Sequence, residues 1–322
     1  SHELPDAHGR MHKVSFTDDV VAIYGGQEAA NQEARVRFFQ TLEELYTANL
    51  KRLKAWCNSH QVSFIGHLLV EEDPLEFIKT QAYPSRALAV FDIPGCDVIG
   101  GFNPLKQNMA LAMARLVASS RSRRGILSES FGAFGHGLRV EDISTVLSWQ
   151  AQRGVTTLVP HALFYSTRGD RKDECPPDLM SEPFWSKMPE LLVDFSSQMH
   201  NHWDDDSSYD AVYYPIESIQ GLYNPQKPTH AMGVSDAMIR KCVNLTNQGV
   251  EFDIVDDRGI RQRLYQYSRL HIPQGIILPT EVQKKVDTFK DQGGTLVLYD
   301  RIVQRRLNIW NVIEPLLKSG DY

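Results

Sequence analysis

The alternation of apolar and polar positions along the chain predicts an α/β fold. Residues 28–59 form one long amphipathic pattern, in which large apolar side chains recur every three or four positions between charged ones. This spacing is typical of a helix with one buried face. Four short apolar runs follow, at residues 62–69, 97–100, 125–128 and 155–159. Because helical patterns separate the later runs, we predict buried strands in a parallel sheet.

The same alternation restarts beyond residue 208. Strands are predicted at residues 210–214, 251–255, 276–278 and 295–299, and helices at residues 235–248 and 280–292. Gly249 and the pair Gly293-Gly294 follow the two predicted helices, where a left-handed cap favours glycine. We therefore expect a second α/β unit of the flavodoxin-like type. It contains no phosphate-binding glycine motif, and Cys242 lies in mid-helix, so we expect no active site there.

The segment between the two units has a different composition. Residues 170–207 are rich in Pro, Asp, Ser, Trp and Met, with one helix predicted near residues 189–201. The acidic run Asp204-Asp205-Asp206 indicates an exposed turn more than a metal site. We divide the chain into a first domain at residues 1–203 and a second at 208–322. The first domain has four predicted strands where a complete barrel needs eight, so we expect either an open sheet or the second half of a barrel.

Composition narrows the classes of partner. The chain has 322 residues and a formal net charge of -6, without a basic stripe, which argues against nucleic acid as a partner. No apolar run approaches the roughly 18 residues needed to span a bilayer, so we expect no membrane partner. The sequence shows no signal peptide and begins at Ser1 without an initiator Met, which we interpret as a trimmed start. The compartment stays open.

Cysteine and histidine spacing gives no sign of a metal. The four cysteines are scattered without a C-x-x-C pair, which indicates buried or incidental thiols. The histidines include no H-E-x-x-H motif. We therefore expect neither a metal nor another cofactor.

Carboxylates follow two of the predicted strands. Glu129 comes at the end of the third run, between Ser128 and Ser130. Glu71 and Glu72 follow the first run, and His67 shares the parity of Glu71 along a strand. Glycosidases need two carboxyl groups across the scissile bond, so Glu129, Glu71 and Glu72 are the candidate catalytic residues. The alternatives are a helix-capping acid for Glu129 and a solvated loop for the other two.

Residues suited to binding a sugar follow the last predicted strand. His161, Tyr165 and Arg168 combine hydrogen-bonding groups with an aromatic face. Trp149 lies on the preceding helix, where a buried packing role is the simpler interpretation. With His67, these four residues form the candidate substrate-binding set. Each of them taken alone would more often be structural.

The residues between 125 and 172 resemble a known group of enzymes. The resemblance consists of S-E-S-F-G at residues 128–132, W-Q at 149–150, G-V-x-x-L-V-P-H-A at 154–162 and Y-S-x-R-G at 165–169. This order resembles the last two β/α units of clan-A-type (β/α)8 glycoside hydrolases. It is most similar to the large α-L-rhamnosidase-like bacterial enzymes, and more distantly to the barrel β-galactosidases.

The resemblance implies roles for several residues. It places Glu129 as the catalytic glutamate of the penultimate barrel strand, and the polar residues after the last strand as sugar ligands. The runs at residues 62–69 and 97–100 would be the fifth and sixth strands. A flavodoxin-like domain without its own chemistry commonly follows in these enzymes. Their general acid/base follows the fourth strand, upstream of the runs found here.

Three hypotheses follow. The first is a glycoside hydrolase that cleaves a terminal, rhamnoside- or galactoside-like sugar with paired carboxyl groups. The second is a non-catalytic carbohydrate-binding or scaffolding fragment of such an enzyme. The third is an α/β transferase that uses the second domain. The sequence leaves open the sugar, its anomer, retention or inversion, and the oligomeric state.

Overall fold

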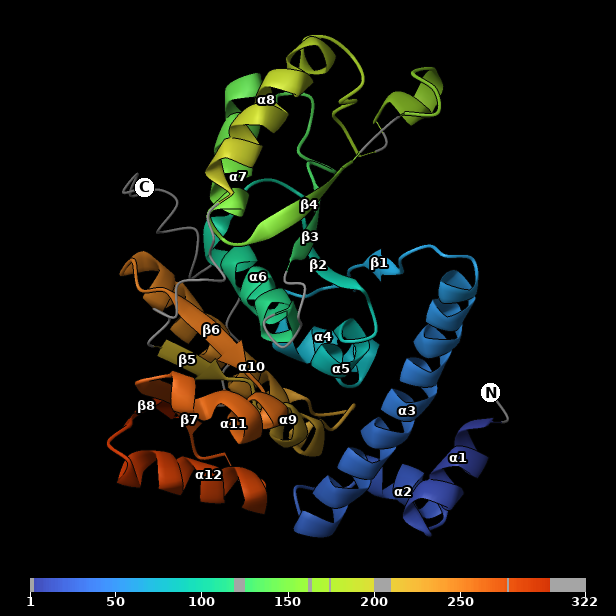
Figure 1. Cartoon of the computed structure of the whole chain (residues 1–322). Helices are drawn as coiled ribbons and strands as arrows, with labels where there is room; N and C mark the ends of the chain where they lie inside the picture. The colour runs from blue at the N-terminus through green and yellow to red at the C-terminus, as the bar shows by residue number, and fades with distance from the viewer. Residues whose placement is uncertain are drawn as a thin grey trace.

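Two four-stranded parallel sheets form the framework (Figure 1). The structure, a computed structural model, describes residues 3–118, 125–161, 164–173, 175–199, 210–276 and 278–301. The first sheet has the order β1-β2-β3-β4, with β1 (Ile65–Gly66), β2 (Ile93–Val98), β3 (Ile126–Ser130) and β4 (Val155–Pro160). All of its strand pairs are parallel, as the sequence predicts, and the sheet curls as half of a barrel does.

Helices precede and flank this first sheet. The chain begins with α1 (Glu3–His12), α2 (Phe16–Ile23) and the long α3 (Ala29–Ser59), which confirms the predicted amphipathic helix. Between and after the strands lie α4 (Pro74–Gln81), α5 (Pro84–Leu88), α6 (Pro104–Ala118), α7 (Val140–Ala151), a 3-10 turn η1 (Gly169–Asp173) and α8 (Phe184–Gln198). Figure 1 shows α3 running along one side of the molecule.

Two predicted strands of the first sheet have different bounds. The run at residues 62–69 pairs over only two residues, and Val62, Ile65 and Leu69 are at least 40% exposed. The prediction that both faces are covered is therefore wrong, because β1 is an edge strand. The run at residues 97–100 overlaps the end of β2, which begins at Ile93 and ends at Val98. Gly100 and Gly101 follow shortly after it with φ angles of 71° and 102°, which only glycine adopts readily.

The second sheet has the order β6-β5-β7-β8 and is also parallel. Its strands are β5 (Asp210–Tyr213), β6 (Phe252–Val255), β7 (Arg269–Gln274) and β8 (Thr295–Arg301). Its helices are α9 (Ile216–Leu222), α10 (Thr229–Asn247), α11 (Asp257–Arg263), the 3-10 turn η2 (Leu264–Gln266) and α12 (Thr280–Asp291). The strand predicted at residues 276–278 is found earlier in the chain, as β7, and residue 277 lies outside the described residues.

One hydrophobic cluster joins helices that flank the first sheet to strands of the second sheet. Phe77 and Leu88 of α4 and α5 are fully buried in the same cluster as Val212 of β5 and Ile254 of β6. Arg115 of α6 adds an ion pair to the second sheet through Asp253 (Nε–Oδ1 3.2 Å). The run Asp204–Asp206 and the predicted division at residues 203–208 lie outside the described residues. The two-domain division therefore stays a prediction.

Local capping explains where the helices next to the first sheet begin. Asp73 accepts hydrogen bonds from the backbone N–H groups of Leu75 and Glu76, and Pro74 is the first residue of α4. Proline is favoured there because the missing N–H would be unpaired anyway. This fixed start anchors the loop that precedes α4. In the described ranges, no helix combines the length and apolar character that a bilayer-crossing segment needs.

Candidate functional site

Glu129 lies on β3, on the face of the sheet opposite the flanking helices. Ser128 and Ser130, its neighbours along the strand, are fully buried against α7, where Gln150 Nε2 donates to both hydroxyls (2.9 Å each). Alternating residues of a strand face opposite sides, so the Glu129 side chain faces away from α7. It is 28% exposed. Asp97 of β2 is the register partner of Glu129, so it faces the same side.

The turn between β1 and α4 brings His67 and Glu71 together. Glu71 is buried, and its Oε1 accepts from Leu68 N–H (2.9 Å) and lies 3.0 Å from His67 Nδ1. Val70 has a φ of 59°, a left-handed conformation that is strained for a β-branched residue. The prediction that His67 and Glu71 lie together is confirmed. The predicted reason, strand parity, is wrong, because β1 ends at Gly66 and the turn after it brings the two side chains together.

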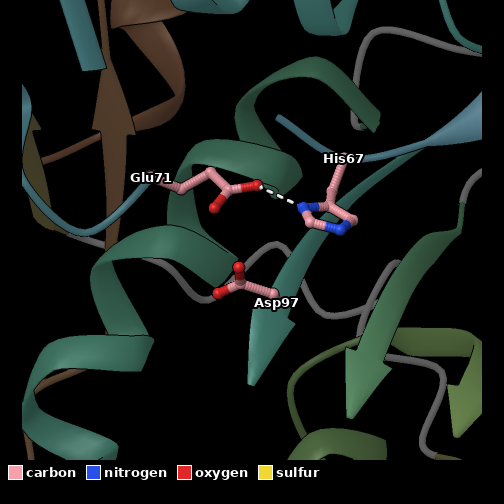
Figure 2. Close-up of side chains that lie close together, drawn as sticks. All are labelled: His67, Glu71 and Asp97. Carbon is pink, nitrogen blue, oxygen red and sulfur yellow. Dashed lines mark hydrogen bonds and ion pairs between the residues drawn. The ribbon is translucent and has the colours of Figure 1, made fainter. Parts of the chain in front are cut away.

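His67 connects Glu71 to Glu129. Its Nε2 lies 2.7 Å from Glu129 Oε2, while its Nδ1 faces Glu71 Oε1 and the Leu68 carbonyl oxygen (2.7 Å). Figure 2 shows the carboxyl group of Glu71 pointing toward the His67 ring, with the carboxyl group of Asp97 below both. Two carboxylates, one on β3 and one in the turn between β1 and α4, are thus held through one imidazole ring.

Burial and the neighbouring charges shift the pKa values of this group. Burial alone would lower the pKa of His67, but the hydrogen bond and charge of Glu71, with the bond to Glu129, raise it to about 10. Burial, followed by the negative charges of Glu71 and Glu72, raises the pKa of Asp97 to about 7. Burial also raises the pKa of Glu71, and hydrogen bonding to His67 opposes that rise. Near neutral pH the group therefore contains an imidazolium and one partly protonated carboxyl group.

His161 follows β4 and reaches the same place. Its backbone N–H donates to Ser130 O (2.8 Å), and its Nε2 lies 4.0 Å from Glu129 Oε1. Its Nδ1 is buried without a hydrogen-bond partner. Gly132 packs so closely that a Cβ there would lie 3.0 Å from His161 Cγ. The predicted neighbourhood of His161 and Glu129 is confirmed.

The other predicted site residues lie elsewhere. Glu72 pairs with Lys106 of α6 instead of facing Glu129. Tyr165 is 91% exposed, with the Arg171 guanidinium 5.4 Å from its ring centroid, so a cavity shared with Glu129 is not confirmed. Arg168 is exposed as well, and its backbone N–H donates to Ser166 Oγ (3.2 Å).

Trp149 belongs to the packing of α7. Its ring meets Phe102 edge-on (centroids 5.4 Å apart), and the Arg153 guanidinium lies 4.7 Å from its centroid. The assignment of Trp149 to substrate binding gains no support from these contacts, which match the simpler packing interpretation.

One group among the described residues has the spacing of a metal site. Ligand atoms of His67, Glu71 and Asp97 lie within 4.8 Å of one another, and Glu71 Oε2 is buried without a hydrogen-bond partner. In this arrangement, however, both nitrogens of His67 face oxygen acceptors, so the ring has no free lone pair for a metal. The imidazolium itself supplies the positive charge that the carboxylates require.

Two residues of this site were missed by sequence reasoning. Asp97 was placed in a strand but not in the site, although a carboxylate near the end of a buried strand, just before Gly100-Gly101, is a usable signal. Gln150 was noted only as part of a motif. Its complete burial and its bonds to Ser128 and Ser130 fix the position of β3, and therefore of Glu129.

Comparison with solved structures relates the fold to that of β-galactosidases. A β-galactosidase from Bacillus circulans sp. alkalophilus superposes with a TM-score of 0.58 at 17% identity, over 83% of this chain and 39% of that one. A β-galactosidase from Rahnella sp. R3 gives a TM-score of 0.54 at 14% identity, over 84% of this chain and 41% of that one. The chain thus spans about two fifths of each neighbour, and at these identities the likeness concerns the fold.

No family model matches the chain. No curated protein matches it either. The glycoside-hydrolase-like fold therefore rests on the structure and on the two solved neighbours.

Proposed function

We propose that the chain carries the sugar-cleaving site of a glycoside hydrolase that acts on a terminal sugar, with Glu129 as its catalytic carboxylate. The observation that carries this proposal is the position of Glu129 at the carboxyl end of a half-barrel strand, bonded to His67 and 4.0 Å from His161. Barrel enzymes build their sites at these strand ends. The neighbouring β-galactosidase folds support the same reaction class.

Glu129 would attack the anomeric carbon or activate a water molecule. Either role requires an ionised carboxylate that stabilises an oxocarbenium-like transition state. Asp97 is the carboxyl group of the described residues that best suits the proton donor, because it is the register partner of Glu129 and its pKa is raised to about 7. A general acid works best when its pKa lies near the working pH.

We also propose a flavodoxin-like fold for the second α/β unit. The order β6-β5-β7-β8 corresponds to the first four positions of the flavodoxin-like order 2-1-3-4-5, which supports a flavodoxin-like unit. That this unit has no active site of its own stays a prediction. The particular likeness to α-L-rhamnosidase-like enzymes rests on the motif at residues 125–172. The choice between a rhamnoside and a galactoside is therefore left to the experiment.

The turnover of aryl glycosides by a Glu129→Gln variant tests the proposal. Gln keeps the shape of Glu but removes the charge, so we expect turnover to fall by orders of magnitude while sugar affinity changes little. Azide should restore activity to Glu129→Ala, whose shorter side chain leaves room for it, with a glycosyl azide as the product. Glu281→Gln, an exposed carboxylate on α12 that pairs with Lys284, is the matched control. Equal turnover in the two variants would remove Glu129 from the mechanism.

The same screen decides between the enzyme and the carbohydrate-binding fragment. An unaltered chain that binds sugars but cleaves none of the aryl glycosides would favour the binding fragment. Asp97→Asn refines the result if the chain is active. Loss of a proton donor harms substrates with poor leaving groups far more than aryl glycosides with good ones, so the ratio of the two rates should change in that variant alone.

A further inference from the structure

His67 separates an accessible carboxylate from a buried one. Glu129 is 28% exposed on its side chain, and that of Glu71 is 1% exposed. The ring contacts both, at 2.7 Å through Nε2 and 3.0 Å through Nδ1. The Leu68 N–H also donates to the oxygen of Glu71 that faces the ring. The buried carboxylate of Glu71 is thereby bonded to the backbone of the same turn. Rotation of the His67 ring would break its hydrogen bond to Glu71 or to Glu129.

We propose that His67 is a positioning residue, held as an imidazolium by the buried carboxylate of Glu71, and that it fixes the carboxylate of Glu129 for reaction. The inference deepens the proposed function and rests on it. It concerns the residue that orients the catalytic carboxylate and not the one that reacts.

Hydrogen-bond accounting supports the charged ring. Oxygen acceptors face both nitrogens, and only the imidazolium donates from both. A buried carboxylate is costly without a partner of opposite charge, and His67 is the cation that Glu71 contacts. The pKa of His67, raised to about 10 against the effect of burial, agrees with this arrangement.

The other groups around the ring do not replace this pair. Asp97 on β2 adds a further carboxyl group, whose pKa is raised to about 7 by burial and by the neighbouring negative charges. Glu72 is neutralised by Lys106 of α6. His161, after β4, lies on the Glu129 side (Nε2–Oε1 4.0 Å). Burial raises the pKa of the Cys96 thiol on β2 well above its ordinary value, so that group stays neutral.

Nitrogen-15 NMR of the ring tests the charge state directly. In the unaltered protein we expect both His67 nitrogens to remain protonated through pH 8. In Glu71→Gln, which keeps the shape but removes the buried charge, we expect the titration midpoint to fall by at least about one pH unit. Glu76→Gln on α4, an exposed carboxylate paired with Lys79, should leave it unchanged. A neutral ring at pH 7 in the unaltered protein overturns the proposal, and this measurement needs no variant to fold.

The pH dependence of turnover tests the positioning role. Turnover is measured in an Asp97→Asn background on an aryl glycoside with a good leaving group, so that the proton donor does not set the alkaline limb. In that background turnover should persist on the alkaline side until His67 loses its proton. Adding Glu71→Gln should move the alkaline limb to lower pH in step with the NMR midpoint, so that kcat at pH 9 falls about twofold or more while KM, and kcat at pH 7, change less. A purely structural residue would lower activity equally at every pH. An alkaline limb that stays in place while the NMR midpoint moves overturns the proposal.

The two proposals fail in different ways. A chain without glycosidase activity overturns the proposed function and, with it, the positioning role, whatever the charge of the ring. An active chain whose His67 is neutral at pH 7 overturns only the inference drawn from Glu71 and His67.

Discussion

Carboxylates lie at the carboxyl ends of both β3 and β6, but in opposite environments. Glu129 is partly exposed on β3 and contacts histidine rings. Asp256 and Asp257 directly follow β6 and are at most 2% exposed. Each lies at the carboxyl end of a parallel strand, where active sites commonly form. A strand-end carboxylate is therefore a useful signal only together with its solvent access and its partners.

The partners of the β6 acids are those of a structural junction. Asp256 caps α11 by accepting from Gly259 N–H (2.8 Å), and Ser85 of α5 donates to its other oxygen. Tyr213 donates to Asp257, and Tyr83 does so at 3.4 Å. These bonds tie α5 to the second sheet across a shared core. At the end of β3 the partners of Glu129 are instead titratable histidine rings, and the carboxylate is partly exposed to solvent. These are properties expected of a catalytic site.

The sharpest test of this contrast is the stability of an Asp257→Ala variant. The substitution leaves the buried hydroxyls of Tyr213 and Tyr83 without their acceptor, and each unpaired buried group costs about 1–3 kcal/mol. We expect the free energy of unfolding to fall by about 2–4 kcal/mol in urea denaturation. Glu129→Ala, at the exposed carboxylate, should lower it by less than about 1 kcal/mol. Equal losses would show that the two sites do not differ in their structural role.

A smaller effect is expected in the pH dependence of stability. Burial raises the pKa of Asp257 to about 7. Between its ordinary pKa of about 4 and that value, the folded state binds more protons than the unfolded one, so stability falls as pH rises. One group contributes at most about 1.4 kcal/mol per pH unit. The urea midpoint should therefore fall less steeply between pH 4.5 and 7 in Asp257→Asn than in the unaltered protein. Glu281→Gln should leave the slope of the midpoint against pH unchanged.

A steeper or equal slope in Asp257→Asn would contradict this assignment. Asp97 titrates in the same window, because its pKa is also raised to about 7. The Asn variant should accordingly reduce the decline without abolishing it. Combining Asp257→Asn with Asp97→Asn should flatten it further, since the two groups lie at different strand ends.

The sequence predicted strands well where their polarity pattern is local. The prediction failed at β7, because its polar residues Arg269 and His271 interrupt the apolar pattern that marks a buried strand. Both side chains bind Asp210 of the neighbouring β5 (Nε–Oδ1 2.5 Å and Nε2–Oδ2 2.9 Å). A partner some 60 positions away neutralises that polarity, and no window along the chain contains it. The missed strand is thus a consequence of pairing between strands.

The candidate site shows the same limit. Glu129 and His161 could be predicted because Glu129 lies at the end of β3 and His161 directly follows β4. The pairing of His67 with Glu71 was predicted for the wrong reason, since it depends on a turn with a left-handed Val70. The place of Asp97 depends on its register with Glu129, which a single sequence does not encode locally. The residues at each strand end could be predicted from the sequence, whereas the side chains that face them from other strands and turns could not.

The smallest expected effect comes from Gly132, which separates β3 from His161. An added Cβ would lie 3.0 Å from His161 Cγ, so Gly132→Ala should push the ring by a few tenths of an ångström from its place beside Glu129. We expect KM for an aryl glycoside to rise about twofold to fivefold with kcat nearly unchanged, as for a lost binding contact. Gly137→Ala is the control, because nothing lies within 4 Å of its added Cβ. If the effect passes through His161, Gly132→Ala should add nothing to His161→Ala; full additivity would instead separate Gly132 from that ring.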